Sequence, residues 1–352
     1  MAAALGLLLV LAVLVRPVAT QQSTNARPPG SQYAGKAFNF TKVAEDVYIA
    51  VGTGALSVVC NAGIIVNENE VMVVDTHISP AAAWALREEL KSITTKPIRY
   101  VVNTHFHVDH AHGNQIYGPD VEVIGHEFAR QRLLAGDSMR GGAYDALIAN
   151  LPAQIAGLKA KAGAASGAER TKIETQLAVA EQSLAAADAV KPTPPNVTLS
   201  QSMTLFRGGR EIRLMFLGRG HTGGDVVVFL PRERVAFTGD LQLANTSYMG
   251  DSYPAEWAET LERLKALDFD MMVPGHGTPF NDKARITYFQ AYLRDFWKQM
   301  QTMHAAKVPI AEAEKRLDMS AHAKVYPSVA PPISTRTAVE RAYALLDKTA
   351  KY

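Results

Sequence analysis

The stretch Thr104-His105-Phe106-His107-Val108-Asp109-His110 decides how this chain is interpreted. It directly follows residues 98–103, an apolar run with the composition of a buried strand. Residues two apart in extended backbone point to the same side, so His105 and His107 can bind one metal ion together. The chain then turns, and the last two residues of the stretch point toward a second position. Imidazole and carboxylate are ligands of open zinc sites, so the stretch predicts a metal centre.

Three more metal-binding residues follow later apolar runs. His221 lies in GRGHTGGD (residues 218–225), Asp240 in TGD (238–240) and His276 in PGHG (274–277). Each has glycine nearby, which allows backbone to approach a crowded site. A single histidine or aspartate at a strand end is more often structural. All three, in this order after the first motif, form a specific pattern.

The motifs HFHVDH, GRGHT, TGD and PGHG resemble those of the metallo-β-lactamase superfamily, over about residues 47–279. The resemblance implies an α/β (α+β) fold, a four-layer αβ/βα sandwich with the site at one edge of its two sheets. It implies a first metal bound by His105, His107 and His221, and a second bound by Asp109, His110 and His276. It implies that Asp240 bridges the two metals and that Asp75, after another buried strand, supports the ligand loop.

A site of this kind activates water. Two metal ions about 3.5–4 Å apart hold a bridging water and lower its pKa to near neutrality, and the resulting hydroxide attacks the substrate. Asp109 can bind the second metal, orient the nucleophile and relay its proton. The histidine-rich set favours two Zn²⁺ ions per chain, although iron or manganese can occupy similar carboxylate-bridged sites.

The remaining pattern divides the chain into a catalytic domain at 41–281 and a C-terminal helical extension at 282–352. Within residues 143–190, two Ala-rich helical patterns predict a helical hairpin inserted between two halves of the domain. Its role is open between a decorating insertion and a lid or dimerisation element. We expect strands at 47–51, 56–66, 71–75, 98–103, 121–124, 203–206, 211–217, 226–230, 235–238 and 271–273, and helices at 80–93, 126–135, 254–267, 282–303, 309–318 and 335–349.

The N-terminus predicts export. Residues 1–15 are almost wholly apolar but are shorter than the roughly 20 residues that span a bilayer as a helix. Small residues and then polar ones follow, so residues 1–20 are interpreted as a signal peptide and 21–40 as a flexible leader. An uncleaved anchor is the alternative. Cleavage implies a periplasmic or secreted protein with no stable membrane association.

Composition limits the partners. The net charge of +2 is too near neutral to indicate a nucleic acid partner, so a small-molecule substrate is expected. The oligomeric state stays open.

Several single residues also have an expected place. Asn245 and Tyr248, in the loop after Asp240, are candidates for substrate binding. Cys60 is expected in a buried strand, His77 at the surface, and His112 facing solvent or capping a helix.

Several activities are compatible with these motifs, because a fold does not select a substrate. Hydrolysis of a β-lactam, lactone or ester bond is favoured, as in an exported β-lactamase-like enzyme. A glyoxalase II-like thioesterase is an alternative, which export disfavours, and other hydrolases of the superfamily also stay open. A metal-binding periplasmic accessory protein without turnover is the alternative outside enzymes.

Overall fold

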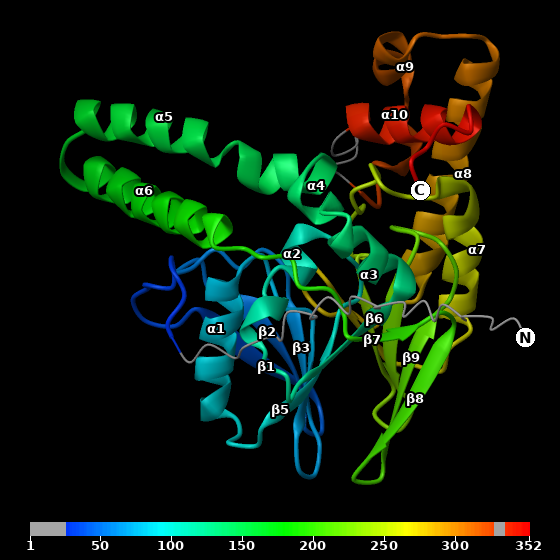
Figure 1. Cartoon of the computed structure of the whole chain (residues 1–352). Coiled ribbons are helices and arrows are strands. Elements are labelled where there is room, and N and C mark those ends of the chain that lie inside the picture. Colours follow the sequence, from blue (N-terminus) through cyan, green and yellow to red (C-terminus); the bar gives the residue numbers. More distant parts are fainter. Residues whose placement is uncertain (1–25, 327–334) are drawn as a thin grey trace, which may run out of the picture.

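The computed structural model describes residues 26–326 and 335–352, and two β-sheets form its centre (Figure 1). The first sheet has the strand order β1-β2-β3-β4-β5-β6-β7 and the second the order β12-β11-β10-β9-β8. The strands of the first sheet are β1 (Phe38–Ala44), β2 (Val47–Gly52), β3 (Ala62–Val66), β4 (Val71–Val74), β5 (Ile98–Val102), β6 (Glu122–His126) and β7 (Val197–Leu199). Those of the second are β8 (Ser202–Arg207), β9 (Arg210–Phe216), β10 (Val226–Leu230), β11 (Val235–Gly239) and β12 (Met271–Pro274).

Both sheets change from antiparallel to parallel pairing along their width. In the first sheet β1 to β4 pair antiparallel, and β4 to β7 pair parallel. In the second sheet β8 to β11 pair antiparallel, while β11 and β12 are parallel. Neighbouring parallel strands end at the same edge of a sheet. The loops after β4, β5, β11 and β12 therefore meet there.

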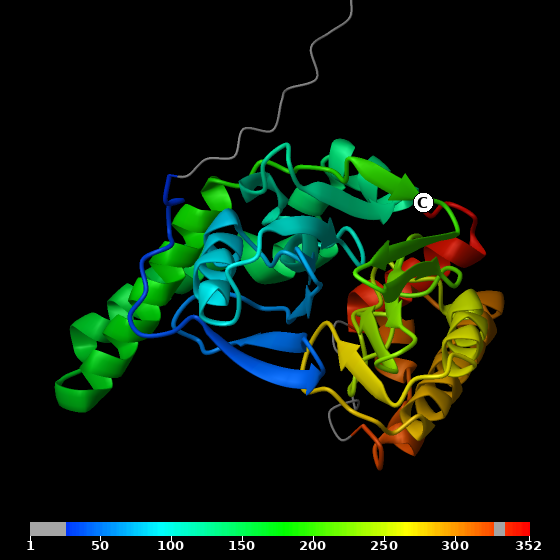
Figure 2. The ribbon, with the colours of Figure 1, turned by 90° about the horizontal axis from the view of Figure 1, so that it is seen from below.

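The two sheets pack face to face, with helices outside. Ile65, Val102 and Ile124 of the first sheet share one buried cluster with Val228 and Phe237 of the second. The strands β3 and β10 are buried along their whole length, which accounts for their uninterrupted apolar sequences. Figure 2 shows the resulting four layers of helix, sheet, sheet and helix, and the predicted fold class is confirmed.

Helices close the outer faces of both sheets. Helix α1 (Pro80–Glu89) covers the first sheet, where Ala82 and Leu86 join its outer core. Helix α7 (Pro254–Lys265) buries Trp257, Leu261 and Leu264 against the second, at the i, i+4, i+7 spacing of one helix face. The same core takes in α8 (Ala284–Ala305), α9 (Ile310–Arg316) and α10 (Thr335–Leu346), so helices occur in all three segments predicted after residue 281.

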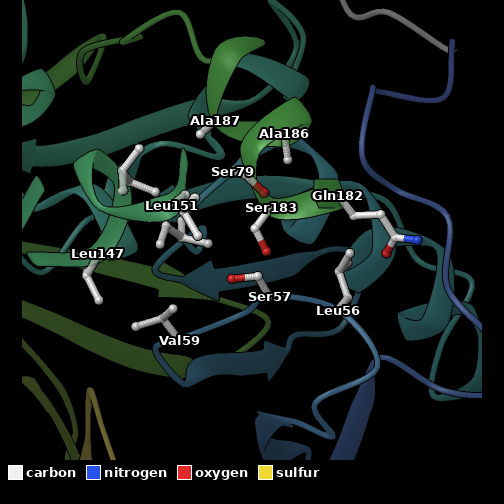
Figure 3. Close-up of a pocket in the computed structure, with 12 residues that line it drawn as sticks. Leu56, Ser57, Val59, Ser79, Leu147, Leu151, Gln182, Ser183, Ala186 and Ala187 are labelled. Atoms are coloured by element: carbon white, nitrogen blue, oxygen red, sulfur yellow. The ribbon is translucent and has the colours of Figure 1, made fainter. Parts of the chain in front are cut away.

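A helical hairpin projects from the sandwich (Figure 1). It consists of α5 (Leu151–Ala164) and α6 (Gly167–Asp188) and is preceded by the short α4 (Gly142–Tyr144). At its base, Leu151 and Ala187 pack with Val108 of the first motif. A narrow cavity of about 40 Å³ separates this base from residues 56–59 (Figure 3). The hairpin therefore contacts the segment that carries the metal-binding residues.

Two predictions about local structure were wrong, and two strands were not predicted. The strand predicted at 56–66 begins only at Ala62, because the preceding residues form a loop in which Val59 has φ +69°. Cys60 is buried, but it lies in this loop instead of in a strand. Strands β1 and β7 were missed, since β1 carries exposed polar residues and β7 has three residues directly after a proline-rich segment.

The N-terminal region was only partly predicted. Residues 1–20, interpreted as a signal peptide, lie outside the described residues, as do 21–25 of the leader. The rest of the leader packs on the domain: Ser31 and Ala37 are buried, and β1 begins at Phe38. Ala37 and Phe38 pack in the core of the first sheet, and Gly30 lies against α6 (Gly167–Asp188). The polar composition of the leader did not indicate these contacts. Within 26–326 and 335–352, no helix is both long and apolar enough to cross a membrane.

Candidate metal centre

The predicted ligands converge from four loops at one edge of the two sheets. His105 lies in the loop after β5, and His107 precedes the short helix α2 (Val108–Ala111). His221 lies between β9 and β10, Asp240 directly follows β11, and His276 follows β12. Three overlapping groups of these side chains place their ligand atoms within 4.8 Å of one another: His105, His107 and His221; His105, His110 and Asp240; and Asp109, His110 and His276.

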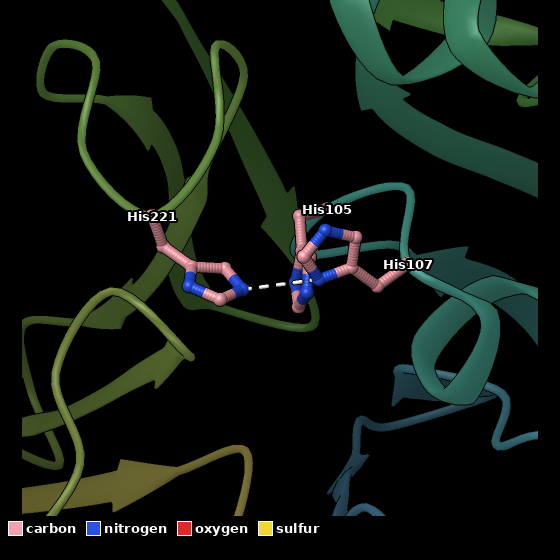
Figure 4. Close-up of side chains that lie close together, drawn as sticks. All are labelled: His105, His107 and His221. Atoms are coloured by element: carbon pink, nitrogen blue, oxygen red, sulfur yellow. Dashed lines mark hydrogen bonds between the residues drawn. The ribbon is translucent and has the colours of Figure 1, made fainter. Parts of the chain in front are cut away.

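The first group contains only imidazoles (Figure 4). Nε2 of His221, from the second sheet, lies 3.1 Å from Nδ1 of His107, from the first. Nε2 of His105 is buried and has no hydrogen-bond partner among the described residues. An unpaired buried polar atom costs about 1–3 kcal/mol, so this nitrogen fits a metal ligand better than a structural histidine.

We call Asp109, His110 and His276 the second group, which combines imidazoles with a carboxylate and lies next to Asp240. Nε2 of His276 lies 3.1 Å from Oδ2 of Asp109 and 3.3 Å from Oδ2 of Asp240. Nε2 of His110 lies 3.5 Å from a carboxylate oxygen of each of the same aspartates. Oδ2 of Asp240 is also 3.7 Å from Nε2 of His221. Among the described residues, Asp240 thus lies close to imidazoles of both groups.

Asp75 holds the first motif in place. Its Oδ1 accepts a hydrogen bond from the backbone N–H of Thr104 at 2.8 Å, and its Oδ2 contacts both Thr104 Oγ1 and His110 Nδ1 at 2.8 Å. The backbone of Asp75 has φ +65°, a conformation that costs roughly 1–3 kcal/mol in a non-glycine residue. These contacts leave Nε2 of His110 directed to the predicted second metal position, and they place Asp75 where sequence analysis expected a supporting residue.

The loop that carries His276 is fixed by close backbone contact. Asn61 donates from Nδ2 to the carbonyl oxygens of Pro274 and Gly277, at 3.0 and 2.8 Å. A Cβ on Gly275 would lie 2.3 Å from Oδ1 of Asp240. Glycine is therefore required beside His276, because any side chain there would displace the carboxylate of Asp240.

Asp251, which was not predicted from the sequence, lies in the loop between β11 and α7. Its Oδ2 lies 3.0 Å from Nε2 of His107. The only available signal was an aspartate shortly after Asp240, in the loop where Asn245 and Tyr248 were proposed to bind substrate. The ring of Tyr248 packs edge-on against His107 at 5.8 Å, whereas Asn245 is exposed.

His77 was placed wrongly from the sequence, and His112 caps a helix, as one alternative expected, but does not face solvent. His77 is fully buried, with Nδ1 3.4 Å from Sγ of Cys60, because the loop after β4 turns into the core instead of outward. His112 ends α2 and is buried, with Nε2 3.0 Å from Oγ of Ser138. Ser138 lies in the short helical turn 137–139 that follows α3 (Glu127–Leu134), and periodicity could not show this contact.

The two groups differ in protonation. Burial and the neighbouring imidazoles lower the pKa of His221 to about 3 and hold that of His105 well below its usual value. Burial also disfavours charge on His276, but Asp240 and Asp109 raise its pKa to about 10. Asp109 and Asp240 likewise raise the pKa of His110 despite its burial. Before metal binds, His105 and His221 therefore offer neutral lone pairs, whereas His110 and His276 carry protons.

This difference predicts a pH dependence of metal binding. Protons and metal compete for the imidazoles of His110 and His276, so a metal ion there releases protons and binds more tightly as pH rises toward the pKa of about 10 of His276. Affinity for the second metal should increase by up to about 100-fold per pH unit if two protons leave, and affinity for the first much less. Chelator competition at pH 6, 7 and 8 measures both affinities. Equal slopes for the two metals would contradict this account.

Comparison with known proteins gives concordant matches. The family model of the metallo-beta-lactamase superfamily matches residues 57–276. A linear primary-alkylsulfatase from Pseudomonas sp. is 24% identical over 234 residues, which are 64% of this chain and 42% of that protein. A metallo-beta-lactamase type 2 from Bacteroides fragilis is 32% identical over 89 residues, 24% of this chain and 36% of that protein. This chain therefore spans less than half the length of either relative.

A solved structure shares the fold. The metallo-beta-lactamase from Pontibacter korlensis superimposes with a TM-score of 0.51, at 21% sequence identity, over 73% of this chain and 99% of that one. At this identity the likeness concerns the sandwich alone.

Proposed function

The chain belongs to the metallo-beta-lactamase superfamily, and from that premise we propose that it is a metal-dependent hydrolase with a dinuclear centre. One observation carries the proposal: seven metal-binding side chains from both sheets converge within ligand distance in two groups that share the carboxylate of Asp240. An accessory protein that only stores metal needs no second group and no shared carboxylate. We therefore favour catalysis over that alternative.

The geometry supports a specific assignment of ligands. His105, His107 and His221 would hold the first metal through imidazole nitrogens. Asp109, His110 and His276 would hold the second, and Asp240 would be shared by both. The chemistry of this set, five imidazoles and two carboxylates, suits two Zn²⁺ ions. When bound, such a pair supplies an activated water and a Lewis acid for the attacked bond.

The chain's own residues complete the chemistry. Oδ2 of Asp109 lies between the imidazoles of His110 and His276, where it can accept the proton of the attacking water and pass it to the leaving group. Burial opposes its charge, but these imidazoles hold the pKa of Asp109 well below its usual range. Asp75 and Asn61 fix the two ligand loops, so the acceptor is positioned before substrate arrives.

Two substrate classes are supported by particular observations. Cyclic amide or ester substrates, such as β-lactams and lactones, are suggested by the match to metallo-beta-lactamases. Sulfate esters are suggested by the longer match to the alkylsulfatase. Export to the periplasm or medium, inferred from residues 1–20, is part of the proposal and would bring the site to external substrates.

A hydrolysis screen tests this proposal. Protein loaded with zinc is assayed against a cephalosporin, a lactone, a thioester, a phosphodiester and an alkyl sulfate. We expect turnover of at least one class that disappears with chelation and returns with zinc. Metal-loaded protein that is inert toward all five classes would favour a binding role instead.

A further inference from the structure

The two ring nitrogens of His107 have separate partners. Nδ1 lies 3.1 Å from Nε2 of His221 and thus faces the first group of ligands. Nε2 points the other way, 3.0 Å from Oδ2 of Asp251. The ring is buried, and one fifth of the Asp251 side chain is exposed. Asp251 therefore places a carboxylate against the first group, whose own three side chains are all imidazoles.

Asp251 is held by a helix that lies beyond the matched family region. Nε of Arg341, in α10, donates to the carbonyl oxygen of Ser252 at 2.9 Å, and the Arg341 guanidinium packs over the ring of Tyr253 at 4.8 Å. Arg341 is buried, and its positive charge acts on Asp251. The loop from 251 to 253 is thereby fixed to the C-terminal helices.

We propose that Asp251 is a positioning residue for His107 and that Arg341 makes α10 part of the support of the metal centre. The inference rests on the proposed metal centre. A carboxylate that accepts the Nε2–H of an imidazole fixes the tautomer in which Nδ1 carries the free lone pair. It also fixes the ring plane. Without Asp251, His107 can rotate or change tautomer, and the first metal loses part of its affinity.

The chain offers a matched control for this contact. Nε2 of His304 lies 2.8 Å from Oδ1 of Asp347, a histidine–aspartate pair of the same kind among the C-terminal helices. It lies outside the cluster, and its aspartate is about half exposed. Asp347→Ala therefore removes the same kind of histidine–aspartate contact at a place where no metal is expected.

The test compares Asp251→Ala, Asp251→Asn and Asp347→Ala with the wild-type chain. Affinity for the first zinc is measured by chelator competition, and the absorption spectrum of the cobalt-loaded protein reports the ligand geometry. Loss of such an outer partner typically lowers metal affinity about 10–100-fold. We expect this loss in Asp251→Ala with an altered cobalt spectrum, a smaller loss in Asp251→Asn, whose amide oxygen can still accept the Nε2–H, and no loss in Asp347→Ala. Thermal unfolding of the metal-free proteins checks that each variant folds.

A direct readout of the tautomer complements the affinities. In zinc-loaded wild type, ¹⁵N NMR should show the His107 proton on Nε2, and Asp251→Ala should broaden or shift that signal. First-metal affinity in Asp251→Ala within twofold of wild type, or an equal loss in Asp347→Ala, would overturn the inference while the proposed function stands. A wild-type chain that binds no zinc would overturn the proposed function itself, and this inference with it.

Discussion

Asp109→Asn is expected to lower turnover by about 10²–10⁴-fold, the usual range for loss of a positioned acid–base group. The substitution keeps the size of the side chain and one oxygen, but removes the charge and the basicity. In the structure, the carboxylate is almost fully buried and lies 3.1 Å from Nε2 of His276. An amide there cannot accept the proton of the attacking water.

The comparison needs a substrate from the class that the screen identifies, and metal content must be measured for each preparation. Glu127→Gln is a matched control, because it removes a carboxylate charge at the start of α3, outside the ligand set. We expect it to keep normal turnover. If Asp109→Asn retains near-normal turnover with two metals bound, Asp109 is a replaceable ligand and its role as a base is wrong.

His107→Ala should abolish activity at limiting zinc by a different route. It removes one of three imidazoles of the first group and leaves the ring partners His221 and Asp251 without their contact. The loss of first-metal affinity should exceed the roughly 10–100-fold effect of changing an outer partner. Dialysis against trace zinc followed by metal analysis measures it.

Excess zinc distinguishes the two variants. Mass action refills a weakened site, so added zinc should partly restore His107→Ala but not Asp109→Asn, whose defect is chemical. His304→Ala, which removes a histidine among the C-terminal helices, should behave as wild type. A His107→Ala protein that holds its first zinc as tightly as wild type would show that His107 is not a ligand.

The sequence predicted the fold because each signal was local. Alternating and continuous apolar runs indicated most strands, and the ligand residues follow those runs directly, as His105 follows β5 and Asp240 follows β11. Strands that end at one sheet edge must bring such residues together, so the cluster could be foreseen without coordinates.

The remaining features depend on contacts between distant segments. Asp251 and His107 are 144 residues apart, and no periodicity links them. The loop before β3 is apolar enough for a strand, but Asn61 ties it to the backbone around His276 instead. Likewise His77 is polar and follows a strand, yet the turn at Asp75, with φ +65°, directs it into the core. The packing of distant segments therefore decides the conformation of these loops and the burial of these side chains.

Anomalous diffraction at the zinc edge, from crystals grown with zinc near pH 8, tests the central claim most directly. We predict two peaks about 3.5–4 Å apart, one beside the imidazoles of His105, His107 and His221 and one beside Asp109, His110 and His276, with Asp240 between them. A single peak, or two peaks that do not share Asp240, would contradict the assignment of these seven side chains to one dinuclear centre.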